Sequence, residues 1–335
     1  MSGPTRRSPS VSPAGVDDLE ATHRSIELSP RIGSYHVVSK FPSSASTDVF
    51  LAYKTTTFGF LRRAVLKWVD GRRPDRSAAR KALSDEARAI SCLDHPSVVS
   101  IFDYVEAEEG DHLALEYVAG TDLRRCLAEL SRRGRALPWP EACFVACELL
   151  RGLAHVHEAR DPSGRPLDIV HRDVNPSNVL LGDDGRIKLT DFGTVRMAGR
   201  AQSDTAPGLV KGKVRYLAPE YISDRQCSLQ IDLYGVGVML LEMITGRPAF
   251  AAGSSTEVMV RIIREGISLS DLYAVETPPE LVELISRATQ RDPTRRFSDA
   301  RSMLVALEAF MAHTGAFTSA TCFAGLLRAQ QLLPV

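Results

Sequence analysis

The chain has 335 residues, and 44% of them are hydrophobic, which is enough apolar material for one large domain or for two lobes with a sizeable core. Lysine plus arginine and aspartate plus glutamate number 41 each, so no global field draws the chain toward nucleic acid or an anionic membrane. No run approaches the roughly 18 apolar residues of a membrane span, and no signal peptide opens the chain. The composition predicts a globular cytoplasmic protein that neither binds nucleic acid nor inserts into a membrane.

The six cysteines are scattered through apolar segments without paired spacing, which favours reduced, buried thiols. Cys143 and Cys147 lie one helical turn apart, but the sequence offers no further ligands to complete a metal site around them. We therefore expect no metal at this pair.

The first third of the chain has the pattern of a small β-rich lobe behind a disordered arm. Residues 1–30 are rich in serine and proline and poor in large apolar residues, which predicts the arm. Three β-rich runs then predict an antiparallel meander, and a basic helix and two more strands follow. The runs are 35–41, 48–54 and 63–69, the helix is 77–95, and the later strands are 98–107 and 112–118.

The character of the chain changes to helical after Gly120. Long helical stretches cover 122–133 and 140–160, and the near-continuous apolar run 231–246 suits the middle of a helical lobe. We predict an α+β protein whose two lobes, 31–116 and 120–312, are joined near 116–120.

A tail, 313–335, follows the helical lobe and contains a short apolar helix predicted over 322–333. The tail either docks on the helical lobe of its own chain or binds a partner, and the N-terminal arm is a second candidate for partner docking.

The strongest chemical signal is "HRDVNPSNVLL" at 171–181, followed by "DFG" at 191–193. These motifs resemble the protein kinase family, specifically the bacterial eukaryotic-type serine/threonine kinases, in a variant with an HRDVNP catalytic loop. The likeness runs from about residue 35 to 312. A "DFG" alone would be weak evidence, but chance matches each position about one time in twenty, so an ordered set is hard to dismiss. The resemblance implies the bilobal protein kinase fold, with ATP and Mg²⁺ as cofactors.

The resemblance also implies catalytic roles for individual residues. Asp173 would orient the proton of the attacking hydroxyl, while Asn178 and Asp191 would supply hard oxygen ligands for Mg²⁺ on the ATP phosphates. Lys67, in "AVLK", would hold the α- and β-phosphates and pair with Glu86 from the helix.

The stretch "LALEYVAGTDL" resembles the last strand and hinge of the small lobe. Leu115 would be the gatekeeping residue, and the Glu116 carbonyl and the Val118 amide would bind adenine. Three further residues match positions that sandwich the adenine ring, although ordinary core packing explains them equally well: Val49, Val65 and Leu180.

The glycine-rich loop of the family, L-G-x-G-x-x-G-x-V, is degenerate in this chain. Alignment on Val49 places Pro42, Ser44 and Thr47 at the glycine positions, where glycine normally lets the backbone approach phosphate. The amides near the tip, from Ser44 through Ala45 and Ser46 to Thr47, keep their N–H groups and carry small side chains. The resemblance therefore predicts a stiffer or differently shaped lid and weaker nucleotide binding.

Two further departures concern the catalytic centre. Asn175 stands where serine/threonine kinases usually carry lysine, and Lys213 stands where they usually carry threonine. Two interpretations remain open: Lys213 returns the cation that Asn175 lacks, or Lys213 points to solvent. Both changes also blur the distinction between serine/threonine and tyrosine as substrate.

Other motifs separate protein kinases from small-molecule phosphotransferases with a similar catalytic set. "APE" at 218–220 and Arg296 resemble the pair that ties the activation segment to the helical lobe, and Asp232 matches the aspartate that braces the catalytic loop. Ser203 and Thr205 are candidate phosphorylation sites in that segment.

The sequence therefore predicts an ATP- and Mg²⁺-dependent protein kinase that phosphorylates serine or threonine of a cytosolic protein. The alternative is a pseudokinase that serves as a binding or scaffold module, which the missing glycines favour and the retained catalytic residues oppose.

Overall fold

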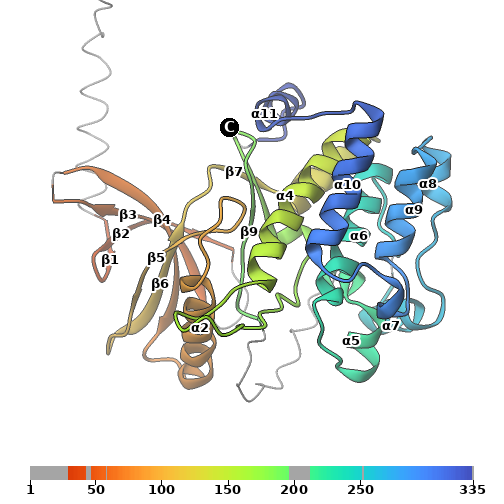
Figure 1. Ribbon diagram of the computed structural model, residues 1–335. Coiled ribbons are helices and arrows are strands. Elements are labelled where there is room, and N and C mark those ends of the chain that lie inside the picture. The colour runs from red at the N-terminus through yellow and green to blue at the C-terminus, as the bar shows by residue number, and fades with distance from the viewer. Residues whose placement is uncertain (1–28, 43–46, 58, 196–211, 251–252, 334–335) are drawn as a thin grey trace, which may run out of the picture. The chain divides into compact units, whose positions relative to one another are not determined.

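A computed structural model describes residues 29–42, 47–57, 59–195, 212–250 and 253–333 (Figure 1). The chain forms two compact units: unit 1 is Met1–Leu83 with Phe102–Tyr117, and unit 2 is Ser84–Ile101 with Val118–Val335. Helix α2 (Arg76–Ser91) begins in unit 1 and ends in unit 2. The predicted N-terminal arm lies almost wholly outside the described residues.

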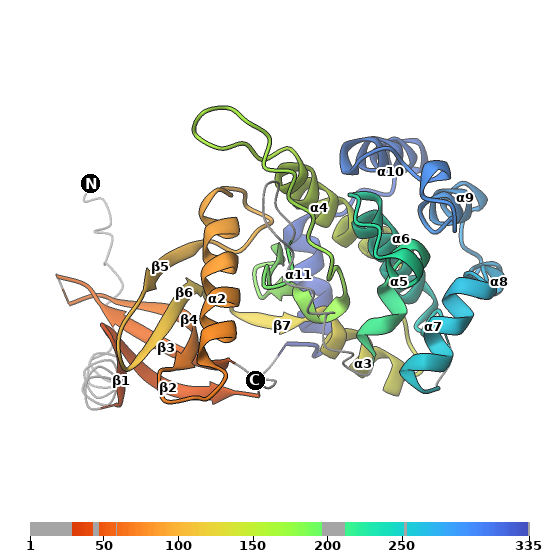
Figure 2. The same cartoon turned by 90° about the horizontal axis from the view of Figure 1, so that it is seen from below.

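Unit 1 is built on a six-stranded sheet with the order β1-β2-β3-β4-β6-β5 (Figure 2). The predicted meander is present as β2, β3 and β4, and β6 rather than β5 lies next to β4 in antiparallel pairing. The strands are β1 (Arg31–Ile32), β2 (Tyr35–Phe41), β3 (Asp48–Thr55), β4 (Leu61–Asp70), β5 (Ile101–Val105) and β6 (Gly110–Glu116).

The register of this sheet separates a packed face from a second face. Side chains alternate along a strand, and residues directly opposite each other in an antiparallel pair share a face. One face carries a buried cluster formed by Tyr35, Ala52, Ala64, Leu66 and Ala114. The register pairs Val49 with Lys67 and Val65 with Leu115. These four residues, all of them predicted nucleotide contacts, therefore share the opposite face.

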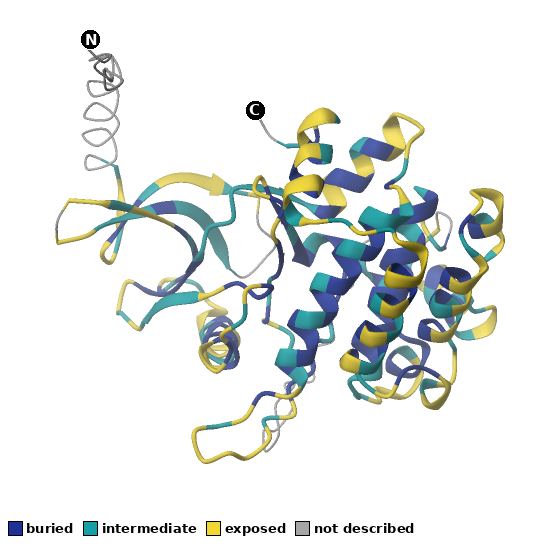
Figure 3. Ribbon diagram, turned by 45° about the horizontal axis from the view of Figure 1, so that its top comes forward, coloured by how far each residue is buried: buried dark blue, intermediate teal, exposed yellow. Residues whose placement is uncertain are grey.

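Unit 2 is mainly helical. Its long apolar helix α6 is buried along almost its whole length and packs against α4 and α9, while α10 also packs on α4 (Figure 3). The helices are α3 (Leu123–Arg132), α4 (Trp139–His157), α5 (Pro219–Asp224), α6 (Gln230–Thr245), α7 (Ser255–Arg264), α8 (Ser270–Ala274), α9 (Pro279–Ala288), α10 (Ala300–Thr314) and α11 (Ala320–Ala329).

A three-stranded sheet in unit 2 has the order β7-β8-β9, with β7 (Gly120–Asp122), β8 (Val179–Gly182) and β9 (Ile187–Leu189). Asp122 ends β7 and caps α3, since its carboxylate accepts a hydrogen bond from the Arg125 backbone N–H at 2.9 Å. Antiparallel β8 and β9 form a hairpin, and the residues that flank its open end carry the kinase motifs.

The C-terminal helix α11 packs on unit 2 of its own chain. Phe323 is fully buried, and its ring centroid lies 5.6 Å from that of Phe144. Arg328 Nη2 donates to the Asp183 carbonyl at 2.6 Å in the β8–β9 turn. Gly185 in the same turn has a φ of +85°, and a Cβ there would collide with the Ala320 backbone. The helix is therefore seated on the hairpin, which agrees with the first of the two interpretations of the tail.

All six cysteines are free thiols, but Cys92 and Cys322 are exposed, so the prediction of buried thiols is wrong for these two. Burial raises the pKa of Cys126 and of Cys147 to about 12, so these thiols stay protonated at neutral pH. No helix within the described ranges is long and apolar enough to cross a membrane.

Candidate active site

The loop that carries Asp173 is held in place by the buried carboxylate of Asp232. Asp232, near the start of α6, accepts hydrogen bonds from the backbone N–H groups of His171 (2.9 Å) and Arg172 (2.8 Å) and from His157 Nε2 (2.9 Å). Arg172 has a φ of +65°, a left-handed conformation that is strained for a residue with a side chain. The hydrogen bonds to Asp232 hold the loop in this conformation, in agreement with the bracing role expected for Asp232.

The pKa of Asp232 reflects this arrangement. Burial by itself raises the pKa, but the hydrogen bonds and the neighbouring His157 and His171 outweigh burial, so the pKa lies below its usual value. The ionised carboxylate is therefore the form that the folded loop requires.

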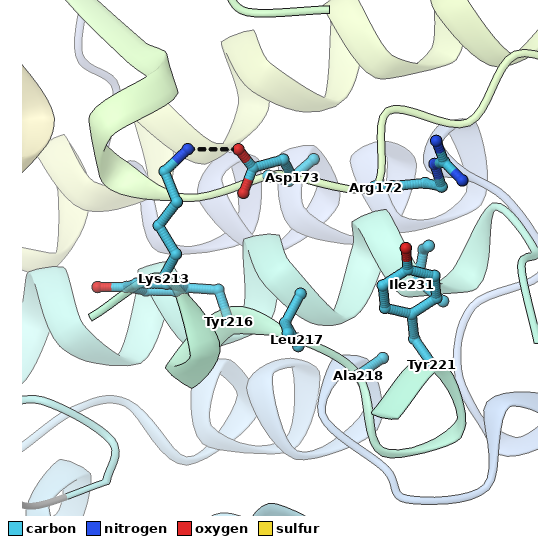
Figure 4. Close-up of a pocket in the computed structure, with 9 residues that line it drawn as sticks. Arg172, Asp173, Lys213, Tyr216, Leu217, Ala218, Tyr221 and Ile231 are labelled. Atoms are coloured by element: carbon cyan, nitrogen blue, oxygen red, sulfur yellow. Dashed lines mark hydrogen bonds and ion pairs between the residues drawn. The ribbon is translucent and has the colours of Figure 1, made fainter. Parts of the chain in front are cut away.

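The Asp173 carboxylate is almost completely buried and accepts three hydrogen bonds. Oδ1 accepts from Asn175 Nδ2 at 2.8 Å, and Oδ2 accepts from Asn178 Nδ2 at 2.9 Å and from Lys213 Nζ at 2.6 Å. Figure 4 shows the Lys213 ammonium pointing at this carboxylate. The sequence alone left open whether Lys213 faces Asp173 or solvent, and the structure places it on Asp173.

Asn178 and Asp191 flank the open end of the β8–β9 hairpin. The pairing of Val179 with Leu189 continues outward as a hydrogen bond from the Thr190 N–H to the Asn178 carbonyl at 2.9 Å. Because Asn178 precedes β8 and Asp191 follows β9, the hairpin brings the two predicted metal ligands to the same end.

The two side chains suit a hard cation. Asn178 Nδ2 donates to Asp173, which directs the amide so that Oδ1 is the atom left to face a ligand. Asp191 has a φ of +66°. The carboxylates of Asp191 and Glu86 both lie near Gly193, since a Cβ on Gly193 would be 3.5 Å from Asp191 Oδ1 and 3.6 Å from Glu86 Oε2. Carboxylate and amide oxygens are the ligands that Mg²⁺ prefers, so this donor set fits the ion.

The segment 212–220 contacts the rest of unit 2 at two points. Glu220 and Arg296 form a buried, bidentate ion pair with both N–O distances at 2.7 Å, which is the contact expected from the "APE" motif. The hydroxyl of Tyr216 hydrogen-bonds the Glu242 carboxylate of α6, and burial raises the pKa of Glu242. This second contact could not be predicted from the sequence, because a buried carboxylate within an apolar helix has no local signal for its partner.

A pocket in unit 2 opens beside Asp173 and Lys213 (Figure 4). Its other lining residues belong to the loop that carries Asp173, to η2 (Lys213–Tyr216) and to the residues after it: Arg172, Val174, Tyr216, Leu217, Ala218, Tyr221 and Ile231.

The remaining predicted site residues are divided between the units. Unit 1 holds Val49, Val65, Lys67 and Leu115 on one face of its sheet and Glu116 at the end of β6. Unit 2 holds Glu86, Val118 and Leu180. Leu180 lies in β8 opposite Asp122 of β7. The pairing of Lys67 with Glu86 stays a prediction.

The degenerate loop connects β2 to β3. Phe41 pairs with Val49 at its base, and Lys40 Nζ lies 2.7 Å from Asp48 Oδ1. The predicted phosphate contacts Ser44, Ala45 and Ser46 lie outside the described residues. The candidate phosphorylation sites Ser203 and Thr205 also lie outside them.

Comparison with known proteins agrees with this geometry. The family model described as "Protein kinase domain" matches residues 36–310. The chain therefore belongs to the protein kinase family.

Its relatives include bacterial enzymes of this family. The chain is 33% identical over 279 residues to the serine/threonine-protein kinase PknL of Mycobacterium tuberculosis, covering 82% of this chain and 65% of PknL. It is 30% identical over 279 residues to the tyrosine-protein kinase MasK of Myxococcus xanthus, covering 83% of this chain and 43% of MasK. It is 31% identical over 218 residues to the serine/threonine-protein kinase PrkC of Bacillus subtilis, covering 65% and 32%. The chain thus spans less than two thirds of the length of each of these curated relatives.

Proposed function

We propose that the protein is an ATP- and Mg²⁺-dependent kinase that transfers the γ-phosphoryl group to a serine or threonine hydroxyl of a protein substrate. The observation that carries the proposal is the Asp173 carboxylate, fixed by two asparagine amides and one ammonium in a chain of the protein kinase family. A scaffold would need neither this arrangement nor the hairpin that joins Asn178 to Asp191.

In the proposed reaction a hydroxyl oxygen of the substrate bonds to the γ-phosphorus, and the bond from that phosphorus to the β–γ bridging oxygen breaks. ADP departs with the electron pair of the broken bond, and Asp173 orients the hydroxyl and accepts its proton. Catalysis then consists of positioning and electrostatic stabilisation, because the reacting groups need little covalent help from the protein.

Asn178 and Asp191 would hold the magnesium ion. When bound, Mg²⁺ would neutralise part of the charge on the ATP phosphates. Lys67 is proposed to hold the α- and β-phosphates, and Val49, Val65 and Leu115 are proposed to contact the adenine. Their common face in the unit 1 sheet supports this assignment.

Tyrosine is a second candidate acceptor. MasK, which covers a similar share of this chain as PknL, is named a tyrosine-protein kinase, and the lysine and threonine typical of serine/threonine kinases are replaced by Asn175 and Lys213. The similarity to PknL and PrkC, both named serine/threonine-protein kinases, favours serine or threonine as the acceptor.

The test is incubation of the purified protein with labelled ATP, Mg²⁺ and generic polypeptide acceptors, beside Asp173→Asn. We expect incorporation by the wild type and its near loss in the variant. Acid hydrolysis of the product then identifies phosphoserine, phosphothreonine or phosphotyrosine. Equal labelling by wild type and Asp173→Asn would refute the kinase proposal and favour the pseudokinase interpretation.

We also propose Ser203 and Thr205 as autophosphorylation sites, with Arg172 as a cation able to pair with phosphate. Mass spectrometry of protein incubated with ATP tests this, and an active preparation without phosphate on residues 194–213 would contradict it. The proposed substrate is an unidentified protein of the cytoplasm, with the N-terminal arm as a docking segment.

A further inference from the structure

Asn175 is fully engaged in holding the catalytic loop. Its Nδ2 donates to the Asp173 backbone carbonyl (2.9 Å) and to Asp173 Oδ1 (2.8 Å), and its Oδ1 accepts from the Ser177 N–H at 2.9 Å. The side chain caps η1 (Pro176–Asn178) and is buried. Asn175 therefore contributes no charge, and both of its N–H donors are used within the loop.

Lys213 supplies a positive charge at the same carboxylate. Its Nζ lies 2.6 Å from Asp173 Oδ2, and 28% of the Lys213 side chain is exposed, against 5% for Asp173. An ammonium has three N–H donors, so one bond to Asp173 leaves donors for a ligand in the pocket. The partly exposed amine therefore contacts Asp173 and lines the pocket beside it.

The backbone beneath Lys213 is firmly anchored, as a functional cation requires. Lys213 opens the turn η2, whose Val214 is buried in a cluster with Phe250, Val258 and Ile262. The Tyr216 hydroxyl at the end of the same turn bonds Glu242. Both ends of the turn are thus fixed to the helical body of unit 2.

An anionic carboxylate close to the phosphoryl group during its transfer repels that group, because both are negatively charged. The transferred group carries negative charge on its equatorial oxygens, and Asp173 adds another negative charge close to it. The two asparagine amides that hold Asp173 are neutral. Lys213 is the ammonium that contacts Asp173 among the described residues, so it is placed to offset this repulsion.

We propose that Lys213 is a catalytic residue whose ammonium bridges Asp173 and the γ-phosphoryl group during transfer. This inference rests on the proposed kinase function and adds a residue to it. As the hydroxyl oxygen bonds to the γ-phosphorus and the β–γ bridging oxygen leaves with ADP, the Lys213 ammonium donates hydrogen bonds to a γ-oxygen and remains protonated. The hydroxyl proton goes to Asp173. The catalytic cation is thus carried by the segment before "APE" and not by the catalytic loop.

The decisive experiment compares Lys213→Met with Lys213→Arg in steady-state assays with Mg-ATP and a generic acceptor. The methionine side chain has a similar length without charge, whereas arginine retains the charge. Removal of one stabilising donor of this kind lowers kcat by about 10²–10³-fold. We expect that loss for Lys213→Met, with the KM for ATP changed by less than ~3-fold, and a kcat for Lys213→Arg at least ~10-fold above that of Lys213→Met. Arg215→Met is the matched control, because Arg215 lies in the same turn but outside the pocket lining.

Folding and catalysis can be separated in these variants. Asp173 keeps its two amide donors when Lys213 is removed, and the melting temperature of each variant measures any loss of stability separately from kcat. For Lys213→Ala, added ethylammonium should restore part of kcat, which a purely structural role would not allow.

Each other outcome has a clear meaning. An active wild type with equally active or more active Lys213→Met would overturn the inference alone, as would equal losses in the methionine and arginine variants without amine rescue. Equal labelling by wild type and Asp173→Asn would overturn the kinase proposal and this inference with it.

Discussion

The buried pair of Arg296 and Glu220 offers a sharp test of how unit 2 is stabilised. Every N–H of the Arg296 guanidinium has an acceptor. Two bonds go to the Glu220 carboxylate at 2.7 Å, and three go to the carbonyls of Gln290 (2.7 Å), Gln230 (3.1 Å) and Arg291 (3.2 Å). The Arg296 side chain is fully buried and that of Glu220 is 7% exposed. Replacing Arg296 by alanine would therefore leave the buried Glu220 carboxylate without its cation.

The expected magnitude follows from that uncompensated charge. Removing one partner of a buried ion pair typically destabilises a protein by about 3–5 kcal/mol. With a urea dependence of about 3 kcal/mol per M, Arg296→Ala should lower the unfolding midpoint by roughly 1–2 M. Far-ultraviolet circular dichroism is the suitable signal, because most helices belong to unit 2.

The neighbouring residue provides the control for this prediction. Arg295 has a side chain that is 75% exposed and lies 3.8 Å from Asp292, and exposed pairs contribute only about 0–1 kcal/mol. Arg295→Ala should therefore leave the midpoint nearly unchanged. Arg296→Lys should fall between the two, since lysine keeps the charge but cannot form the bidentate contact. A midpoint for Arg296→Ala equal to that of Arg295→Ala would refute the reasoning.

Three further predictions address the loop brace, the tail and the lid. The pKa of Asp232 is lower in the folded than in the unfolded protein, so its contribution to stability is present above about pH 4 and is lost as the pH falls through the folded-state pKa. Asp232→Asn should flatten the acid limb in urea titrations over a pH series, and an unchanged limb would argue against it. Phe323→Ala should destabilise the fold by about 3–5 kcal/mol and speed hydrogen exchange in α11. Phe317→Ala, at a side chain that is 77% exposed, should change stability by less than ~0.5 kcal/mol, and similar effects of the two would contradict the docking of α11. Restoring glycine at Pro42, Ser44 and Thr47 should strengthen Mg-ATP binding in calorimetry, whereas unchanged affinity would show that the lid does not depend on glycine.

Much of the fold was predictable because the relevant signals are local. The alternation of β2 to β4, the continuous apolar character of α6 and the ordered motifs around Asp173 and Asp191 are all readable along the chain. The strand and helix types follow from side-chain periodicity, and the family follows from motif order. The predicted tail helix was displaced by two residues at its start and by four at its end, since Ser319 caps α11 and the helix ends at Ala329.

The sequence by itself therefore determined the family and the fold class, and it predicted which carboxylates are catalytic. It did not determine what contacts those carboxylates. Asn175, Asn178 and Lys213 converge on Asp173, and the Lys213 contact spans 40 positions of the chain. Hydrogen-bond partners so far apart in sequence are selected by packing, here by the burial of Val214 and the Tyr216–Glu242 contact that fix the turn carrying Lys213. Only the tertiary structure decided between the two interpretations of Lys213, because it places the ammonium on the Asp173 carboxylate and not in open solvent.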